Sequence, residues 1–134
     1  MKKVFYLSTC NTCQRIIKEL GGLSGFEHQN LKEKNISAKE LDFLKTKAGS
    51  YEALFNRRSM KYRAWGLKEK NLTEKDYRKY ILEEYTFLKR PVIVDGEAVF
   101  IGNAKKVVAA AKEHLSQSSL PAGRQESDSL QSSV

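Results

Sequence analysis

The sequence has few cysteines, few prolines and no long apolar run. Its 134 residues include two cysteines, two prolines and two histidines. No stretch approaches the roughly 20 consecutive apolar residues of a membrane-spanning helix, so we expect no membrane association. The apolar run before Ser8 holds only four residues, which is shorter than the core of a signal peptide. We therefore expect a cytoplasmic protein.

The small number of cysteines and histidines argues against a disulfide scaffold and against a zinc site. A secreted disulfide-rich domain would need more cysteines at longer spacing. Structural zinc needs about four ligands. Apart from Cys10 and Cys13, only His28 and His114 could serve, and neither histidine has a partner at finger-like spacing. We predict no metal site.

The Cys10–Cys13 pair has the Cys-x-x-Cys spacing that favours redox chemistry in a cytoplasmic chain. We expect Cys10 at the N-terminus of the first helix, where free amides and the helix dipole stabilise a thiolate and lower its pKa. Cys13 lies one helical turn further and could resolve a mixed disulfide on Cys10 by thiol exchange. The alternative is that both are buried structural cysteines.

Basic residues outnumber acidic ones by 24 to 16, which gives a net charge of +8. A basic surface attracts phosphate, acidic proteins or small oxyanions without distinguishing among them. The densest segment is 56–63 (NRRSMKYR), which holds four cations and is followed by Trp65. Because the planar arginine fork suits oxyanions, this segment is a candidate anion site. The alternative is a solvated basic loop.

The hydrophobic periodicity predicts an α/β domain over residues 1–115. We expect strands at 3–7, 26–31, 91–94 and 98–101, and helices at about 10–20, 37–48, 51–55, 73–88 and 103–115. Ser37 and Thr73 open capping boxes, and Asn103 is expected to cap the last helix. The order β-α-β, helices, β-β-α is that of a thioredoxin-like fold with a helical insertion at about 32–88. A parallel first strand pair is expected.

The sequence also supports predictions for the C-terminal segment and for Pro91. Residues 116–134 contain seven serines, three glutamines and no apolar period, so we predict a disordered tail. Pro91 opens the third strand and would face the Cys-x-x-Cys helix. Because only about one X–Pro bond in twenty is cis in folded proteins, spacing alone favours a trans edge proline.

Three motifs resemble the glutaredoxin-linked arsenate reductase / Spx family. They are 5–15 (FYLSTCNTCQR), 56–59 (NRRS) and 88–96 (LKRPVIVDG). The motifs occur in the family's order, and the resemblance covers about residues 3 to 115. It implies a thioredoxin-like core with an inserted helical subdomain. It also implies that Cys10 is the nucleophile, that Arg58 and Arg90 hold an oxyanion and favour the thiolate, and that Pro91 is cis.

The sequence departs from typical arsenate reductases of this family at two places. They have a third arginine soon after the last strand, whereas Ile101-Gly102-Asn103 offers none, which weakens the expectation of tight arsenate binding. They usually lack a cysteine at the position of Cys13. The Cys-x-x-Cys pair is instead the pattern of Spx-type redox-sensing regulators.

Two functions are therefore expected. The leading one is a cytosolic thiol-dependent reductase, in which Cys10 attacks arsenate or a disulfide, without a cofactor. Cys13, glutathione, glutaredoxin or thioredoxin would then supply the resolving thiol. The alternative is a Spx-like transcription regulator that binds RNA polymerase and uses a Cys10–Cys13 disulfide as its switch.

Overall fold

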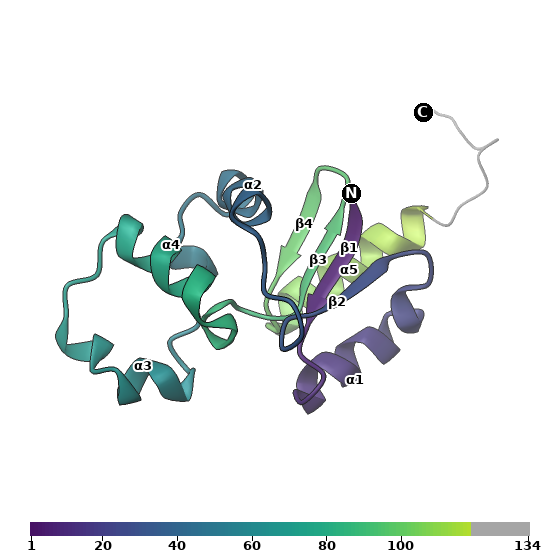
Figure 1. The fold of residues 1–134 in the computed structure, drawn as a ribbon. Helices are drawn as coiled ribbons and strands as arrows, with labels where there is room; N and C mark the ends of the chain where they lie inside the picture. The colour runs from purple at the N-terminus through teal and green to yellow at the C-terminus, as the bar shows by residue number, and fades with distance from the viewer. Residues whose placement is uncertain (119–134) are drawn as a thin grey trace.

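The structure, a computed structural model, describes residues 1–118 and is built around a four-stranded mixed sheet (Figure 1). The strand order is β2-β1-β3-β4. Strand β1 pairs in parallel with β2 and antiparallel with β3, and β3 pairs antiparallel with β4. The strands are β1 Lys2–Tyr6, β2 Glu27–Asn30, β3 Val92–Asp95 and β4 Ala98–Ile101. The predicted α/β, thioredoxin-like plan with a parallel first pair is confirmed.

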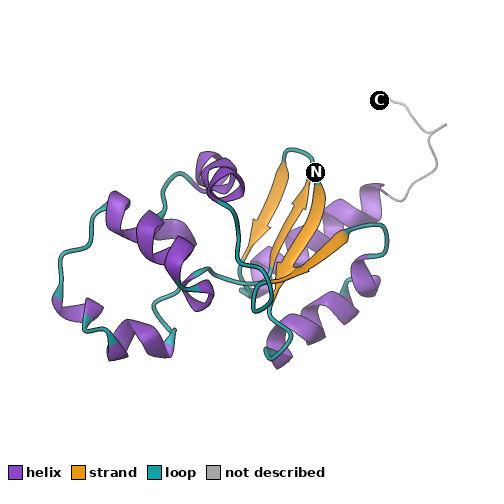
Figure 2. Cartoon of the chain, viewed as in Figure 1, coloured by secondary structure: helices purple, strands orange, loops and turns teal. Residues whose placement is uncertain are grey.

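Helices lie on both sides of this sheet (Figure 2). The α-helices are α1 Asn11–Glu19, α2 Ala38–Ala48, α3 Met60–Ala64, α4 Glu74–Glu83 and α5 Lys105–Ser118. Short 3₁₀ turns are η1 Gly21–Leu23, η2 Glu52–Leu54, η3 Leu67–Glu69 and η4 Tyr85–Phe87. The segment with α2, α3 and α4 lies between β2 and β3 in the chain, where the insertion was expected. No helix of residues 1–118 is long and apolar enough to cross a membrane.

Side-chain alternation along the strands divides the core between the two sheet faces. Val4 and Ile93 face one side and pack with Ala111 of α5 and with residues of α1. Their neighbours Phe5 and Val92 face the other side and pack with the insertion. Figure 1 shows this division, with α1 and α5 on one face and the inserted helices on the other.

The insertion has an apolar core continuous with that of the sheet. The buried members of this shared core are Phe5, Leu31, Ile36, Leu41, Leu44, Leu54, Phe55, Leu67, Tyr77, Ile81, Phe87, Leu88, Val92 and Val94. Phe87 stacks on Phe55 with ring centroids 4.8 Å apart. The buried Lys3 of β1 donates to Glu40 of α2 at 2.7 Å, which adds a polar tie between sheet and insertion.

Both predicted capping boxes are present, but one helix is shorter than predicted. Ser37 and Thr73 each accept a hydrogen bond from the backbone amide three residues later, and the acidic side chain there bonds back. Helix α4 ends at Glu83, so the prediction that it continues to Leu88 is wrong. Glu84 has extended backbone, and its carboxylate accepts from the Thr86 amide, which starts the separate turn η4.

The last helix begins and ends later than expected. Ala104 accepts the first helical bond, from the Val108 amide, so Ala104 rather than Asn103 occupies the N-cap. Helix α5 then runs to Ser118, past the expected end at Leu115. The predicted disorder of the remaining tail falls on residues outside the described part of the chain.

Candidate active site

Cys10 lies where the predicted strand-to-helix turn was expected. It follows β1 and occupies the N-cap of α1 with extended backbone. Its amide donates to Leu7 O at 3.0 Å, and its carbonyl accepts from the Gln14 amide at 3.2 Å. Cys10 is half-buried, Cys13 is fully buried, and the two thiols are not bonded to each other.

The surroundings of Cys10 make its thiol more acidic than an ordinary cysteine. Partial burial alone would raise the pKa of Cys10, because it disfavours the charged form. Hydrogen bonds from the Cys13 amide and the Cys13 thiol outweigh this, and Arg90 lowers the pKa further through its charge and a hydrogen bond. The net result is a lowered pKa, as expected for a cysteine at a helix N-terminus.

Cys13 has the opposite character. Burial raises the pKa of Cys13 to about 12, and the neighbouring Cys10 raises it as well. At neutral pH the Cys13 thiol is therefore protonated. In this state it can donate a hydrogen bond to the Cys10 sulfur, which is one of the contacts that lower the pKa of Cys10.

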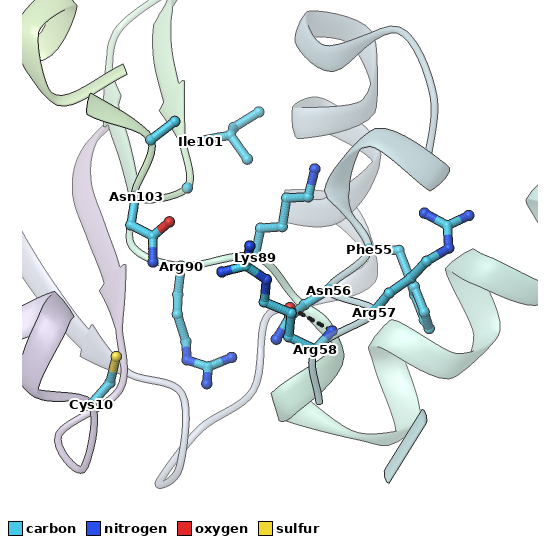
Figure 3. A pocket seen from close by; sticks show the side chains of 11 residues that line it. Cys10, Phe55, Asn56, Arg57, Arg58, Lys89, Arg90, Ile101 and Asn103 are labelled. Atoms are coloured by element: carbon cyan, nitrogen blue, oxygen red, sulfur yellow. Dashed lines mark hydrogen bonds between the residues drawn. The ribbon is translucent and has the colours of Figure 1, made fainter. Parts of the chain in front are cut away.

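A pocket of about 380 Å³ opens beside Cys10 (Figure 3). Its lining contains four cations and no acidic residue: Cys10, Phe55, Asn56, Arg57, Arg58, Lys89, Arg90, Ile101, Gly102, Asn103 and Ala104. In Figure 3 Arg58 and Arg90 extend toward the space beside Cys10, whereas Arg57 and Lys89 point away from it. The structure thus brings together Cys10, Arg58 and Arg90, which are far apart in sequence.

Arg90 is held in place by the backbone and keeps unused hydrogen-bonding capacity. Its Nη1 donates to Thr86 O at 3.3 Å. Its Nε is buried and has no partner among the described residues. The Arg90–Pro91 bond is cis, which corrects the trans proline expected from spacing and agrees with what the family resemblance implies. The Pro91 carbonyl accepts from the Gly102 amide at 2.9 Å.

The basic segment 56–63 is divided between structural and pocket roles. Arg57 donates from Nη2 to the Glu52 carboxylate and to the Tyr77 hydroxyl, each at 2.8 Å. Arg58 is exposed, and its guanidinium has no acidic partner among residues 1–118. Of this segment, Arg58 is therefore the cation that lines the pocket beside Cys10 without an acidic partner among the described residues.

The two histidines have partners within the fold. His28 Nε2 lies 3.1 Å from Leu23 O, and His114 Nε2 lies 2.9 Å from Asp95 Oδ2. In the part of the chain that the structure describes, no group of three or more histidine, cysteine or acidic side chains could hold a metal ion.

Sequence reasoning missed several residues of the pocket. Asn103 was expected to cap a helix, but it lines the pocket, and its amide lies between α5 and Arg90 in Figure 3. Asn56 and Thr86 were not singled out, although both bond to the arginine-bearing segments. Their roles depend on contacts between segments about 30 residues apart, which the local pattern does not encode.

A mixed sheet with a Cys-x-x-Cys pair at its first strand-to-helix turn and a cis proline just before β3 defines a thioredoxin-like α/β protein. The model of the ArsC family matches residues 5–111, and the chain belongs to that family. This confirms the resemblance found in the sequence.

Known relatives agree with this assignment. The uncharacterised Bacillus subtilis (strain 168) protein YusI is 30% identical over 102 residues, covering 73% of this chain and 86% of YusI. An arsenate reductase from Vibrio cholerae has a TM-score of 0.66 at 18% identity, covering 82% of this chain and 96% of its own. A Bacteroides fragilis protein related to the ArsC family has a TM-score of 0.71 at 20% identity, covering 82% and 96%. These two structures establish the fold.

Proposed function

We propose that the protein is a thiol-dependent reductase of the ArsC family, acting in the cytoplasm, in which Cys10 attacks an oxyanion or a disulfide. The observation that carries this proposal is the half-buried Cys10, with its lowered pKa, beside a pocket that contains Arg58 and Arg90 and no acidic residue. A stabilised thiolate supplies the nucleophile, and the guanidinium groups supply paired donors for anionic oxygens.

With arsenate as substrate, the reaction needs two displacements. The Cys10 thiolate attacks arsenic(V) and displaces a hydroxide that leaves as water after protonation, so an S–As bond replaces an As–O bond. A second thiolate then attacks the Cys10 sulfur. An S–S bond forms, the S–As bond breaks, and its electron pair stays on arsenic, which leaves as arsenite.

With a disulfide as substrate, the same thiolate attacks one sulfur and expels the other as a thiolate. In both cases Cys10 ends in a disulfide, either with Cys13 or with an external thiol. Glutathione, glutaredoxin or thioredoxin would return it to the dithiol by exchange. Because Cys13 is buried and its pKa is raised, it is not a free thiolate, and in this proposal it acts as a resolving thiol only after Cys10 has reacted.

A coupled assay tests this proposal. Purified protein is given arsenate, or a small mixed disulfide, with glutathione and glutaredoxin or with thioredoxin, and NADPH consumption through the matching reductase is followed. We expect turnover that is lost in Cys10→Ser. The matched variant Cys13→Ser should lose turnover only with a donor that reduces a Cys10–Cys13 disulfide. Equal background rates for wild type and Cys10→Ser with every substrate would contradict the proposal.

The contact between the two thiols also supports a redox switch as a second candidate. A Cys10–Cys13 disulfide would remove the thiolate and its hydrogen bonds at the start of α1. A Spx-like regulator should bind purified RNA polymerase in the oxidised state and release it when reduced, and it should show no turnover in the assay above. Polymerase binding that is equal in both states, or absent, would argue against the switch.

A further inference from the structure

The two segments that carry Arg58 and Arg90 lie side by side and antiparallel outside the main sheet. Phe55 and Leu88 form an isolated antiparallel bridge. The Asn56 amide donates to Phe87 O at 2.7 Å, and the Lys89 amide donates to Leu54 O at 2.9 Å. This backbone pairing ends at Asn56, two residues before Arg58.

The Asn56 side chain continues the connection beyond the last backbone bond. Its Nδ2 donates to Thr86 O at 3.2 Å, and its Oδ1 accepts from the Arg58 amide at 3.1 Å. The same Thr86 carbonyl accepts from Arg90 Nη1 at 3.3 Å. A short chain of hydrogen bonds therefore runs from the backbone of Arg58, through Asn56 and Thr86 O, to the guanidinium of Arg90.

Thr86 is itself fixed by polar contacts on its other side. Its amide and hydroxyl both donate to Glu84 Oε2, at 3.1 and 2.8 Å. Because the Thr86 hydroxyl donates to the carboxylate, the buried Ser59 hydroxyl donates to Thr86 Oγ1 across 2.7 Å. Lys61 Nζ lies 3.9 Å from Glu84. The carbonyl that Asn56 and Arg90 share thus belongs to a residue whose amide and hydroxyl are both bonded to Glu84.

We propose that Asn56 is a positioning residue that sets the relative placement of Arg58 and Arg90 around the anion through the Thr86 carbonyl. The inference rests on the proposed function, because it concerns the same pocket. Asn56 contacts both segments through one side chain, and each end of its amide is used. Loss of this amide should leave the backbone bridge intact and let the two guanidinium groups separate.

The test compares Asn56→Ala with Asn35→Ala, a control that also removes an amide bonded to the backbone at both ends. Asn35 also uses both ends of its amide for the backbone: Nδ2 donates to Ile81 O and Leu82 O at 2.9 and 3.2 Å, and Oδ1 accepts from the Ile36 amide at 2.8 Å. Asn35→Ala should cost stability without touching the pocket. Asn56→Ser keeps a small polar group and serves if Asn56→Ala does not fold.

Two measurements need no turnover: the pH dependence of Cys10 alkylation, with the modified site identified by mass spectrometry, and protection of Cys10 by inorganic sulfate. We expect Asn56→Ala and Asn56→Ser to weaken sulfate protection about tenfold, the factor for one displaced hydrogen bond to a charged group, and to raise the alkylation midpoint. Asn35→Ala should leave both unchanged.

The outcomes separate this inference from the proposed function. Wild-type values in both Asn56 variants would overturn the positioning role and leave the reductase proposal standing. A similar change in Asn35→Ala would also overturn it, since the effect would then follow general destabilisation. A wild-type protein whose Cys10 has the acidity of a free thiol and gains no protection from sulfate would remove both proposals.

Discussion

At the residue scale, two cysteines in one helical turn have opposite acidity. Cys10 caps the helix and faces Arg90, so its pKa is lowered, whereas burial raises the pKa of Cys13 to about 12. The inequality follows from position: an N-cap sulfur meets free amides and a cation, and a sulfur one turn later meets the apolar core. The two thiols of the pair therefore differ in how readily they ionise.

Two measurements should distinguish the effect of Arg90 from that of Arg58. In Arg90→Ala the pH midpoint of Cys10 alkylation should rise, because Arg90 lowers the pKa of Cys10 by charge and by hydrogen bonding. In Arg58→Ala the midpoint should stay unchanged, while protection by sulfate weakens about tenfold, the cost of one charged hydrogen bond. Iodoacetamide rates from about pH 5 to 10 provide the measurement. An unchanged midpoint in Arg90→Ala would contradict this assignment.

Much of the site could be predicted at this scale, and part of it could not. Cys10 at a helix start follows from the strand, the spacing and the apolar helix stripe. The roles of Arg58 and Arg90 came from family resemblance, since many arginines in this basic chain look alike in sequence. Asn56 opens the 56–59 motif and its bond to the Arg58 amide is local, but its contact with the Thr86 carbonyl 30 residues away could not be predicted from the local pattern.

At the element scale, helices α2 and α4 of the insertion are joined by a polar cluster at their surface. Asp42 Oδ1 accepts from Arg78 Nε at 2.9 Å and from the Tyr51 hydroxyl at 2.6 Å, and Arg78 Nη2 donates to Asp42 Oδ2 at 3.2 Å. These hydrogen bonds, with the Arg78 contact first, lower the pKa of Asp42 to about 2. The carboxylate is thus stabilised in the folded state.

Replacing Asp42 should give a small, pH-dependent loss of stability. A carboxyl group with a lowered folded pKa contributes stability above its unfolded pKa of about 4, and this contribution is lost as pH falls toward 2. Because both side chains are more than a third exposed, solvent screening limits the effect of Asp42→Asn to below ~1 kcal/mol.

Urea unfolding at pH 7 and at about pH 3 measures the difference in stability between wild type and Asp42→Asn, which should be larger at pH 7. Glu19→Gln is the control, since Glu19 forms only an exposed pair with Arg15 at 3.6 Å. If the loss of stability in Asp42→Asn instead grew as the pH fell, the predicted direction of the pH dependence would be wrong.

Element boundaries show where local pattern stops being informative. The capping boxes at Ser37 and Thr73 were predictable because the signal lies within four residues. The end of α4 was not, since the apolar stripe continues through Tyr85 and Leu88. After α4 ends, the 3₁₀ turn η4 places Phe87 in the shared core without continuing the α-helix.

At the scale of the whole molecule, the insertion and the sheet do not have separate interiors. The shared core joins Phe5 and Val92 of the sheet with Leu41, Tyr77 and Ile81 of the insertion. The buried Lys3–Glu40 pair crosses the same boundary. The sequence suggested an inserted subdomain, and the packing shows that it is integrated into one fold with the sheet.

One cooperative unfolding transition is therefore expected. Trp65, the single tryptophan, contacts Phe87 at 5.3 Å between ring centroids and reports on the insertion. The buried Cys13 reports on the sheet and α1 through its reaction with a thiol reagent. Both signals should change at the same urea concentration. Phe87→Ala should lower the free energy of unfolding obtained from each signal by the same amount, about 3–5 kcal/mol. Loss of the Trp65 signal before Cys13 becomes reactive would contradict a single core.

Of the guanidinium groups that extend toward Cys10, Arg58 comes from the turn before α3 in the insertion and Arg90 from the loop that enters β3 (Figure 3). A trimmed protein that joined β2 to the loop before β3, and so removed the inserted helices, would keep Cys10 and Arg90 but lose Arg58. One of the two guanidinium groups beside Cys10 would be gone, and the apolar sheet face that Phe5 and Val92 now share with the insertion would be exposed. Removing the insertion would thus cost part of the positive charge of the pocket and the cover of one sheet face together.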